Sequence, residues 1–247
     1  MEKIKVVVIS GVTSGIGKAA AKVFVNKGYK VIGLGRREDK LNELKKELGY
    51  DVFLNLICDV TDFKQIENKF SNIPEIFKNI SVLVNNAGLI KGVGRFDRIT
   101  SDDYEIMIKT NVLGVINLTK CLFPKIKSSG CGHLVNITSI AAHYAYNGGH
   151  VYASSKAFVE HFGRNLLTEL SDDKVRVTNI SPGKTKTDFF KAQFNGDNIK
   201  AEKVYSEIAP LQPEDIANSI IWAVTQPEHV NISSIEIIPS NNRLSYK

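Results

Sequence analysis

Two side chains near the middle of the chain have the types and spacing needed to move a proton. Tyr152 and Lys156 are four residues apart in a segment with helical periodicity, and residues i and i+4 share one face of a helix. A lysine one turn away favours the phenolate, which lowers the pKa of the tyrosine toward neutrality. Ser139 can donate a hydrogen bond to an oxygen on which charge develops. This set predicts interconversion of an alcohol and a carbonyl, provided that a hydride carrier lies alongside.

Taken alone, a Tyr-x-x-x-Lys spacing is common and more often marks an ordinary amphipathic helix, so the elements around it must decide. Apolar segments predict strands at Ile4–Ile9, Lys30–Leu34, Val52–Ile57, Val82–Val84, His133–Ile137, Arg176–Ile180 and Ser234–Ile238. Helical patterns lie at Ile16–Asn26, Asp39–Leu48, Lys64–Phe70, Asp102–Leu122, Tyr152–Leu170 and Pro213–Thr225. This alternation predicts an α/β fold, with a doubly wound seven-stranded parallel sheet flanked by helices in one Rossmann-type domain spanning residues 1–247.

Composition narrows the class of protein. The chain has 247 residues, is 43% hydrophobic and carries a formal net charge of +6. Its lysines alternate with acids, as in KLNELKKEL, so we expect solvated helix faces and no nucleic-acid partner. No apolar run approaches the ~18 residues of a membrane span, and the N-terminus does not resemble a signal peptide. Three cysteines without CxxC spacing predict no metal site and suit the cytoplasm.

Glycines follow the first predicted strand at the point where a dinucleotide fold binds its diphosphate. The turn has the spacing G-x-x-x-G-x-G and leads directly into a helix. Glycines allow a tight turn, and the N-terminus of a helix attracts an anion. We therefore expect cofactor contacts from Gly11, Thr13, Ser14, Gly15, Ile16 and Gly17.

Two arginines follow the second predicted strand. Many NAD-binding folds have an acid here, which holds the ribose 2′-hydroxyl. This chain has Gly35, followed by Arg36 and Arg37. Guanidinium groups suit a 2′-phosphate, whereas a carboxylate would repel it. The sequence therefore predicts NADP(H) as the cofactor.

Further candidate residues stand at the ends of the other predicted strands, where a parallel sheet binds its ligands. Asp59 is interpreted equally well as a partner for an adenine amino group or as a turn cap. Asn111 lies inside a predicted helix and requires a polar partner, either a water or a local helix distortion. The cofactor contacts expected from these strand ends are Asp59, Val60, Asn85, Ala87, Gly88, Pro182, Gly183, Thr185 and Thr187.

The order and spacing of these motifs resemble the short-chain dehydrogenase/reductase family over essentially the whole chain. The matching motifs are SGVTSGIG, NNAG, Asn111, Ser139, Tyr152-x-x-x-Lys156 and Pro182-Gly183. The resemblance implies that Tyr152 is the acid/base and that Lys156 lowers its pKa and holds the nicotinamide ribose. It also implies that Ser139 orients the carbonyl and that Asn111 supports a water linked to Lys156. Ser10 stands where the family usually has Thr, and it keeps the hydroxyl.

Longer stretches, including YAYNGGHVYASSKAFVEHF and PEHVNISSIEIIP, resemble the NADP-dependent serine and 3-hydroxy acid dehydrogenase branch. That resemblance implies a small-molecule alcohol or carbonyl substrate, a cytoplasmic location and a homotetramer, with a homodimer as the fallback. Gln193 stands where the branch typically has an arginine that could bind a carboxylate. The residues expected at the substrate are Ser139, His143, Gly148 and Gln193.

The segment after Pro182-Gly183 predicts a lid over the site, at about residues 187–205, with a turn at Asn195-Gly196-Asp197. Two other functions fit the same motifs. One is a broad carbonyl reductase or a 3-oxoacyl thioester reductase. The other is an NADP(H)-sensing or scaffold protein without turnover, although a sensor would not need the Asn–Ser–Tyr–Lys set.

Overall fold

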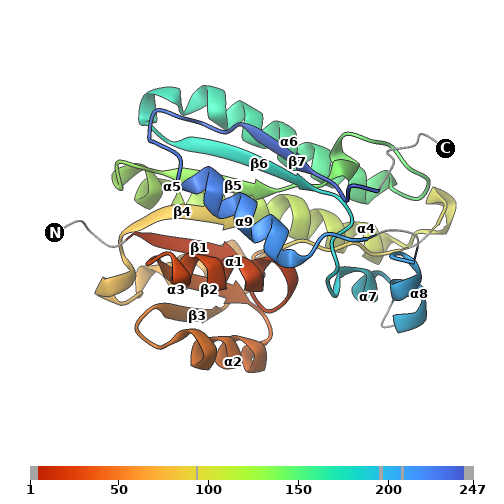
Figure 1. The fold of residues 1–247 in the computed structure, drawn as a ribbon, viewed down its shortest axis with the longest axis horizontal. Coiled ribbons are helices and arrows are strands. Elements are labelled where there is room, and N and C mark those ends of the chain that lie inside the picture. The colour runs from red at the N-terminus through yellow and green to blue at the C-terminus, as the bar shows by residue number, and fades with distance from the viewer. Residues whose placement is uncertain (1–4, 93, 195–196, 207–208, 242–247) are drawn as a thin grey trace.

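A parallel sheet forms the centre of the molecule. The computed structural model describes residues 5–92, 94–194, 197–206 and 209–241. The sheet has seven strands in the order β3-β2-β1-β4-β5-β6-β7, and neighbouring strands are parallel throughout (Figure 1). The predicted doubly wound sheet is therefore confirmed. The strands are β1 Val6–Ser10, β2 Lys30–Gly35, β3 Phe53–Ile57, β4 Ile80–Asn85, β5 His133–Ile137, β6 Arg176–Pro182 and β7 Ser234–Ile237.

Helices cover both faces of the sheet because successive strand residues point to opposite sides and both sides are apolar. Val7 and Ile9 face the core beneath α1, α2 and α9, whereas Val6 and Val8 face the core beneath α3 and α5. In Figure 1, α1 and α9 lie in front of the sheet and α5 and α6 behind it. The bounds are α1 Gly15–Asn26, α2 Glu38–Leu48, α3 Phe63–Ser71, α4 Ser101–Ile108, α5 Gly114–Ser128, α6 His150–Glu169, α7 Phe189–Gln193, α8 Asn198–Lys203 and α9 Pro213–Val224.

A π-helical turn interrupts the helix predicted at Asp102–Leu122. Residues Lys109–Leu113 form this turn between α4 and α5, with Asn111 inside it. The Asn111 side chain accepts a hydrogen bond from the Leu89 amide (2.8 Å) and donates to the Leu89 carbonyl (2.9 Å). It also donates to the Ser155 hydroxyl at 3.0 Å. The polar residue therefore coincides with a local helix distortion, which is one of the two partners expected for it.

The helical span Ser101–Ser128 is long and apolar enough to cross a membrane when judged by length and composition alone. In the structure it lies against the sheet. Leu118, Leu122 and Ile126 are fully buried in the core formed with β1, β2, β4 and β5. Its apolar character is accounted for by this core position.

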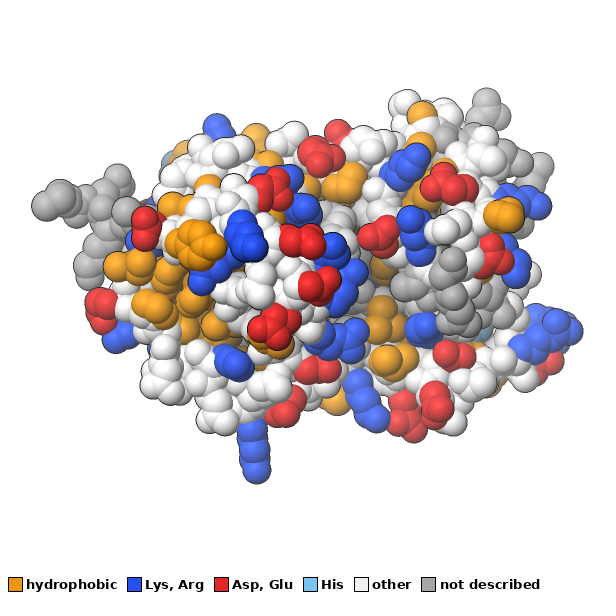
Figure 2. Space-filling model, turned by 90° about the horizontal axis from the view of Figure 1, so that it is seen from below, with side chains coloured by type: hydrophobic (Ala, Val, Ile, Leu, Met, Phe, Trp, Pro, Cys, Tyr) orange, Lys and Arg blue, Asp and Glu red, His pale blue; other side chains and the backbone are white. Residues whose placement is uncertain are grey.

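Charges of both signs are mixed on the surface. Figure 2 shows acidic and basic side chains interspersed on the face that it displays, with no large region of a single sign. Several are paired, such as Lys40 with Glu43 along α2 and Lys22 with Glu47 between α1 and α2. This is the arrangement expected from the alternating lysines and acids of the sequence.

The strand order reverses between β1 and β4, which opens a crevice at the carboxyl ends of the strands. The two short helices α7 and α8 stand at this edge, beyond the ends of the strands (Figure 1). They occupy the segment for which the sequence predicted a lid. The Asn195-Gly196 part of its predicted turn lies outside the described residues.

Candidate functional site

A cavity of about 990 Å³ opens at the carboxyl edge of the sheet, in the crevice where the strand order reverses. It runs from the turn after β1 to α6 and α7. Most of the site residues predicted from the sequence line it: Gly11, Thr13, Ser14, Gly15, Ile16, Arg36, Arg37, Asp59, Val60, Ala87, Gly88, Ser139, Tyr152, Lys156, Pro182, Gly183, Thr185, Thr187 and Gln193. Five predicted residues are not among its lining: Gly17, Asn85, Asn111, His143 and Gly148.

The tyrosine, the lysine and the serine predicted to move a proton meet at one end of the cavity. Tyr152 and Lys156 project from α6, and the Ser139 hydroxyl after β5 forms a hydrogen bond with Tyr152. Lys156 is buried, and its Nζ donates to the carbonyl of Ile137 at 2.9 Å. Helix α6 and the end of β5 thus bring a phenol, an ammonium group and a hydroxyl to the same place.

The pKa values of this set differ from the sequence-based expectation. Burial raises the pKa of Tyr152 well above its ordinary value, and the hydrogen bond from Ser139 opposes this only in part. Burial also lowers the pKa of Lys156 to about 8. In the protein by itself, the loss of hydration outweighs the expected effect of the lysine on the tyrosine. Tyr152 therefore holds its proton at neutral pH, which suits a proton donor.

Asn111 lies behind this set and outside the cavity. A Cβ placed on Gly88 would lie 3.1 Å from Lys156 Nζ and 3.4 Å from Asn111 Oδ1. Gly88 therefore leaves room between the backbone after β4 and these two polar groups. Asn111 contributes through Leu89 and Ser155, whose atoms it holds in place.

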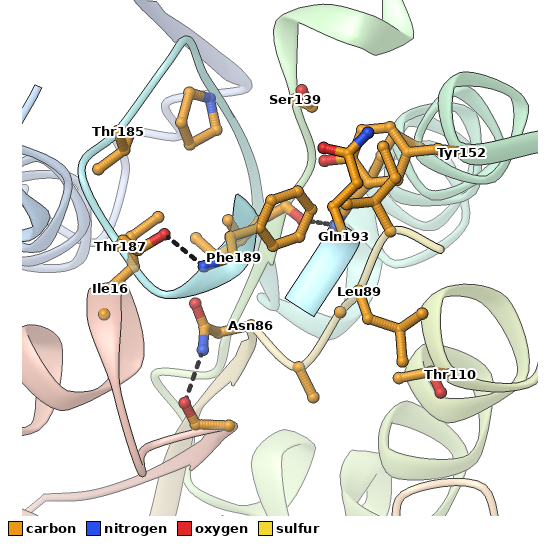
Figure 3. Close-up of a pocket in the computed structure, with 18 of the residues that line it drawn as sticks. Ile16, Asn86, Leu89, Thr110, Ser139, Tyr152, Thr185, Thr187, Phe189 and Gln193 are labelled. Atoms are coloured by element: carbon orange, nitrogen blue, oxygen red, sulfur yellow. Dashed lines mark hydrogen bonds between the residues drawn. The ribbon is translucent and has the colours of Figure 1, made fainter. Parts of the chain in front are cut away.

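Aromatic rings that were not predicted as site residues close this end of the cavity. The Phe189 ring on α7 lies over Tyr152, with ring centroids 5.6 Å apart. Figure 3 shows Phe189 and Gln193 gathered with Tyr152 and Ser139 at this end. Tyr146 also lines the cavity, and burial raises its pKa to about 12. Phe189 could have been predicted from the sequence, since it is an aromatic residue at the start of a segment predicted to cover the site.

One side chain joins the two ends of the lid segment. The buried Tyr205 donates its hydroxyl to the Thr185 carbonyl at 2.9 Å and accepts from the Thr187 amide at 3.4 Å. The Thr187 side chain in turn packs close to Gly15, where a Cβ would meet it at 2.9 Å. The base of the lid therefore touches the glycine-rich turn, and any side chain at Gly15 would disturb both.

The turn after β1 is braced by hydroxyl and amide groups. The Ser10 hydroxyl accepts from the amides of Asn86 (3.0 Å) and Ala87 (2.9 Å). The Asn86 side chain donates to the carbonyls of Ser10 and Gly11. A Cβ on Gly17 would collide with the Gly11 carbonyl and the Asn86 amide. Gly17 is therefore required for close packing under the turn, which explains why it does not line the cavity.

The two arginines after β2 take different partners. Arg37 donates to the Thr13 hydroxyl at 2.6 Å and to the Ser14 hydroxyl at 3.1 Å. Arg36 lies 3.7 Å from the carboxylate of Asp59. Arg37 and the two hydroxyls form a group of donors at the first turn of α1, where no described side chain caps the helix. Such a set fits a phosphate group of a dinucleotide.

Asn85 is buried and points into the protein. It donates to Asn136 on β5 (3.0 Å), which donates to Asn179 on β6 (3.0 Å), which donates to the Glu160 carbonyl of α6 (2.9 Å). This asparagine ladder crosses three strands and holds α6 on the sheet. Asn85 was expected as a cofactor contact, but the structure places its side chain between neighbouring strands. Helix α6 can approach the ladder because it has Gly163 there.

His143 and Gly148 lie apart from the reacting groups. His143 faces Glu236 on β7, with Nδ1 2.9 Å from Oε2. Gly148 lines a separate hollow of about 350 Å³ together with Phe96 and His150. Both residues were expected at the substrate because they follow Ser139 in the chain, but the loop turns them away from the cavity.

Comparison with known proteins agrees with this geometry. The family model for short chain dehydrogenase matches residues 5–198. Serine 3-dehydrogenase of Agrobacterium fabrum is 41% identical over 236 residues, which cover 95% of this chain and 94% of that protein. The NADP-dependent 3-hydroxy acid dehydrogenase YdfG of Escherichia coli strain K12 is 40% identical over 235 residues, covering 95% and 94%. A solved closed form of serine dehydrogenase complexed with NADP+ matches with a TM-score of 0.94 and 40% identity over 96% of each chain. The chain therefore belongs to the short-chain dehydrogenase family.

Proposed function

We propose that this protein is an NADP(H)-dependent oxidoreductase that interconverts a small alcohol and its carbonyl. The observation that carries the proposal is the layout of one cavity. Tyr152, Ser139 and Lys156 meet at one end of it, and Arg37 joins two hydroxyls at the other. Relatives with about 40% identity are named as NADP-dependent or serine dehydrogenases.

The side chains at the reacting end have different roles in proton transfer. Tyr152 carries its proton at neutral pH and donates it to the carbonyl oxygen during reduction. Ser139 donates a hydrogen bond to the same oxygen as negative charge builds on it. Lys156 keeps a positive charge below a pKa of about 8 and steadies the phenolate left on Tyr152. When bound, the nicotinamide supplies or accepts the hydride.

Residues at the other end would hold the dinucleotide. The turn Gly11–Gly15 and the start of α1 suit the diphosphate, and Arg37 with Thr13 and Ser14 suits the 2′-phosphate. Asp59, paired with Arg36, would contact the adenine ring. Lys156 would hold the nicotinamide ribose hydroxyls, as the resemblance to the family implies.

The proposed substrate is a small neutral carbonyl or alcohol, with weaker use of serine and other free 3-hydroxy acids. Gln193 lines the cavity beside Phe189 and offers only neutral donors. Lys191, the nearest cation in the sequence, lies 3.5 Å from Asp188 and is not among the lining residues. Loss of a charge-assisted hydrogen bond weakens binding by about 1.5–3 kcal/mol.

Initial rates with NADPH and a panel of aldehydes, ketones and 3-oxo acids test the proposal, with 3-hydroxy acids and NADP+ for the reverse direction. We expect turnover of neutral carbonyls and a gain in acid oxidation for Gln193→Arg without a change in NADPH affinity. NADPH binding without turnover of any carbonyl would favour the sensor alternative. A sub-millimolar KM of the native enzyme for L-serine would contradict the neutral-substrate proposal. Lys91 and Lys184, which also line the cavity, would then be tested as carboxylate partners.

We further propose a homotetramer or homodimer that acts in the cytoplasm, without a nucleic-acid or membrane partner. Helices α4 to α6 expose apolar side chains, among them Ile108, Leu113 and Phe158, which suits a face covered by a second copy. The Phe158 ring stacks on Phe162, with centroids 6.1 Å apart. Light scattering at micromolar concentration tests the assembly, and a monomer alone would exclude it.

A further inference from the structure

His143 lies between two carboxylates that belong to different elements. Its Nδ1 is 2.9 Å from Glu236 on β7, and its Nε2 is 3.8 Å from Glu160 on α6. The next residue, Tyr144, donates its hydroxyl to the other oxygen of Glu236 at 3.2 Å. Two consecutive side chains of one loop are thus held by a single carboxylate of the edge strand.

Glu160 links His143 to the helix that carries Tyr152 and Lys156. It lies one helical turn after Lys156, and its side chain is only 6% exposed. Glu160 also contacts Arg164 at 3.2 Å and accepts a hydrogen bond from the Ser181 hydroxyl at 3.4 Å. Because a buried carboxylate is costly without partners, these contacts fix where its charge can lie.

The contacts then continue to the catalytic serine. The Ser181 hydroxyl lies 2.6 Å from the Thr138 hydroxyl, and Thr138 immediately precedes Ser139. Thr138 also donates to the Ile180 carbonyl at 3.0 Å. The start of the loop is therefore fixed through Thr138 and Ser181, and its middle through His143 and Tyr144.

The loop held in this way forms one wall of the cavity. Ser139, Ala141, Tyr144 and Tyr146 all line the cavity, whereas His143, Glu160 and Glu236 are not among the lining residues. A residue that cannot reach the substrate can still determine where these lining side chains stand. This accounts for His143 facing away from the cavity although it belongs to the loop that forms the wall.

We infer that His143, Glu160, Glu236 and the Tyr144 hydroxyl form a wall clamp that positions the 139–146 loop and thereby determines how well the enzyme binds its carbonyl substrate. The inference rests on the proposed function. His143, Glu160 and Glu236 are positioning residues, because they act on the substrate only through the loop. The clamp does not include the glycine-rich turn or Arg37, so we expect the binding of the adenosine end of the cofactor to be independent of it.

Steady-state kinetics of Glu236→Ala and Glu236→Gln test the clamp. We expect Glu236→Ala to raise the KM for the carbonyl substrate about tenfold, the order of one lost hydrogen bond to a charged group. NADPH affinity, measured by fluorescence titration, should stay within about twofold of the native value because the adenosine end is untouched. Glu236→Gln keeps an acceptor for Tyr144 and should restore part of the loss.

Two matched pairs separate positioning from general damage. Ser234→Ala changes an exposed residue two positions earlier on β7 and should leave KM unchanged. His143→Asn retains a donor near the position of Nδ1 and should be closer to native in KM than His143→Ala. An equal effect of Ser234→Ala, or a loss of NADPH affinity parallel to the rise in KM, would overturn the inference.

Hydrogen exchange at the amides of residues 139–146 tests the clamp independently of turnover. Glu236→Ala should speed exchange in this loop about tenfold, which corresponds to one lost charged hydrogen bond, and leave β4 and β5 unchanged. If the native protein reduces no carbonyl, the proposed function fails while this measurement still decides the clamp. Native exchange rates in Glu236→Ala would show that no clamp exists, whatever the enzyme does.

Discussion

Buried titratable groups lie at both edges of the sheet, and the contrast between the two edges is instructive. At the carboxyl edge, burial lowers the pKa of Lys156 to about 8. At the amino edge, burial lowers the pKa of His133 to about 3, with a smaller contribution from Arg176. Lys156 lines the cavity, whereas His133 is fully buried and is not among the cavity lining. A shifted pKa therefore reports burial, and only an adjoining cavity turns it into a candidate site.

The partners of the polar groups differ in the same way. At the amino edge His133 contacts the Thr178 hydroxyl at 2.8 Å, and Thr178 donates to the Ile232 carbonyl. Arg176 donates to carbonyls at the end of α9 and in the segment after it, namely Val224, Gln226 and Val230. These bonds fasten one element to another. At the carboxyl edge, by contrast, Tyr152, Ser139 and Arg37 also face the open cavity.

The largest expected effect comes from Tyr152→Phe, at the carboxyl edge. The substitution keeps the ring that packs on Phe189 and removes only the hydroxyl. Turnover should fall by about 10²-fold or more, the usual scale for loss of a general acid. Thermal stability and NADPH affinity should remain near native values. A fully active variant would remove Tyr152 from the mechanism.

Next in size is the effect of Arg37→Ala on cofactor choice. The contacts of Arg37 with Thr13 and Ser14 place it in a group of phosphate donors, so NADP affinity should fall about ten- to a hundredfold. Arg36→Ala is the matched control, since that side chain is 63% exposed and its partner is Asp59. We expect Arg36→Ala to reduce NADP affinity less than Arg37→Ala does. Titrations with NADP and NAD at one salt concentration measure both, and equal losses for the two cofactors would contradict a phosphate role.

Gly163→Ala tests how firmly the catalytic helix depends on the sheet beneath it. A Cβ there would collide with the Asn179 side chain and lie 2.8 Å from the Asn136 amide nitrogen. Helix α6 would have to shift, at a cost of about 1–3 kcal/mol in the free energy of unfolding. Turnover should fall as well, because Tyr152 and Lys156 move with the helix. Urea denaturation measures the effect on stability, and kinetics measure the effect on turnover. Native values for both would show that the asparagine side chains move aside for the added methyl group and that α6 does not shift.

The amino edge should influence stability alone. Because the pKa of His133 is about 3 in the folded protein and 6.5 is its ordinary value, the unfolded chain binds the proton more readily. The stabilisation is present above pH 6.5 and is lost as the pH falls toward 3, at about 1.4 kcal/mol per pH unit.

His133→Gln keeps a donor for Thr178 and removes the titration, so it should flatten this slope. Urea denaturation followed by circular dichroism at pH 7, 6 and 5 provides the comparison between native protein and variant. Turnover at pH 7 should not change. An identical slope in the variant would assign the acid sensitivity to other groups.

Much of this protein could be predicted from local sequence. Most strands are apolar runs of a few residues and most helices repeat their apolar residues at helical spacing, so most predicted elements agree with the structure to within a few residues. The exceptions are the helix predicted at Asp102–Leu122, which a π-helical turn divides and which ends at Ser128, and the short helices α7 and α8, which were not predicted. The glycine turn, the two arginines and the Tyr-x-x-x-Lys pair depend on neighbours within one turn or loop. Their grouping in one cavity follows from a parallel sheet, whose strand ends share an edge.

Only the tertiary structure decided the rest, because it depends on contacts between distant segments. The side chain of Asn85 joins a ladder across β4 and β5 instead of the cavity, and Asn111 coincides with a π-helical turn. His143 turns toward Glu236, a residue 93 positions away in the chain. The pKa of Tyr152 rises because the folded chain removes water from its hydroxyl group, whereas spacing alone predicted a fall. Sequence spacing determines which groups can meet, and the packing of distant segments determines what surrounds them.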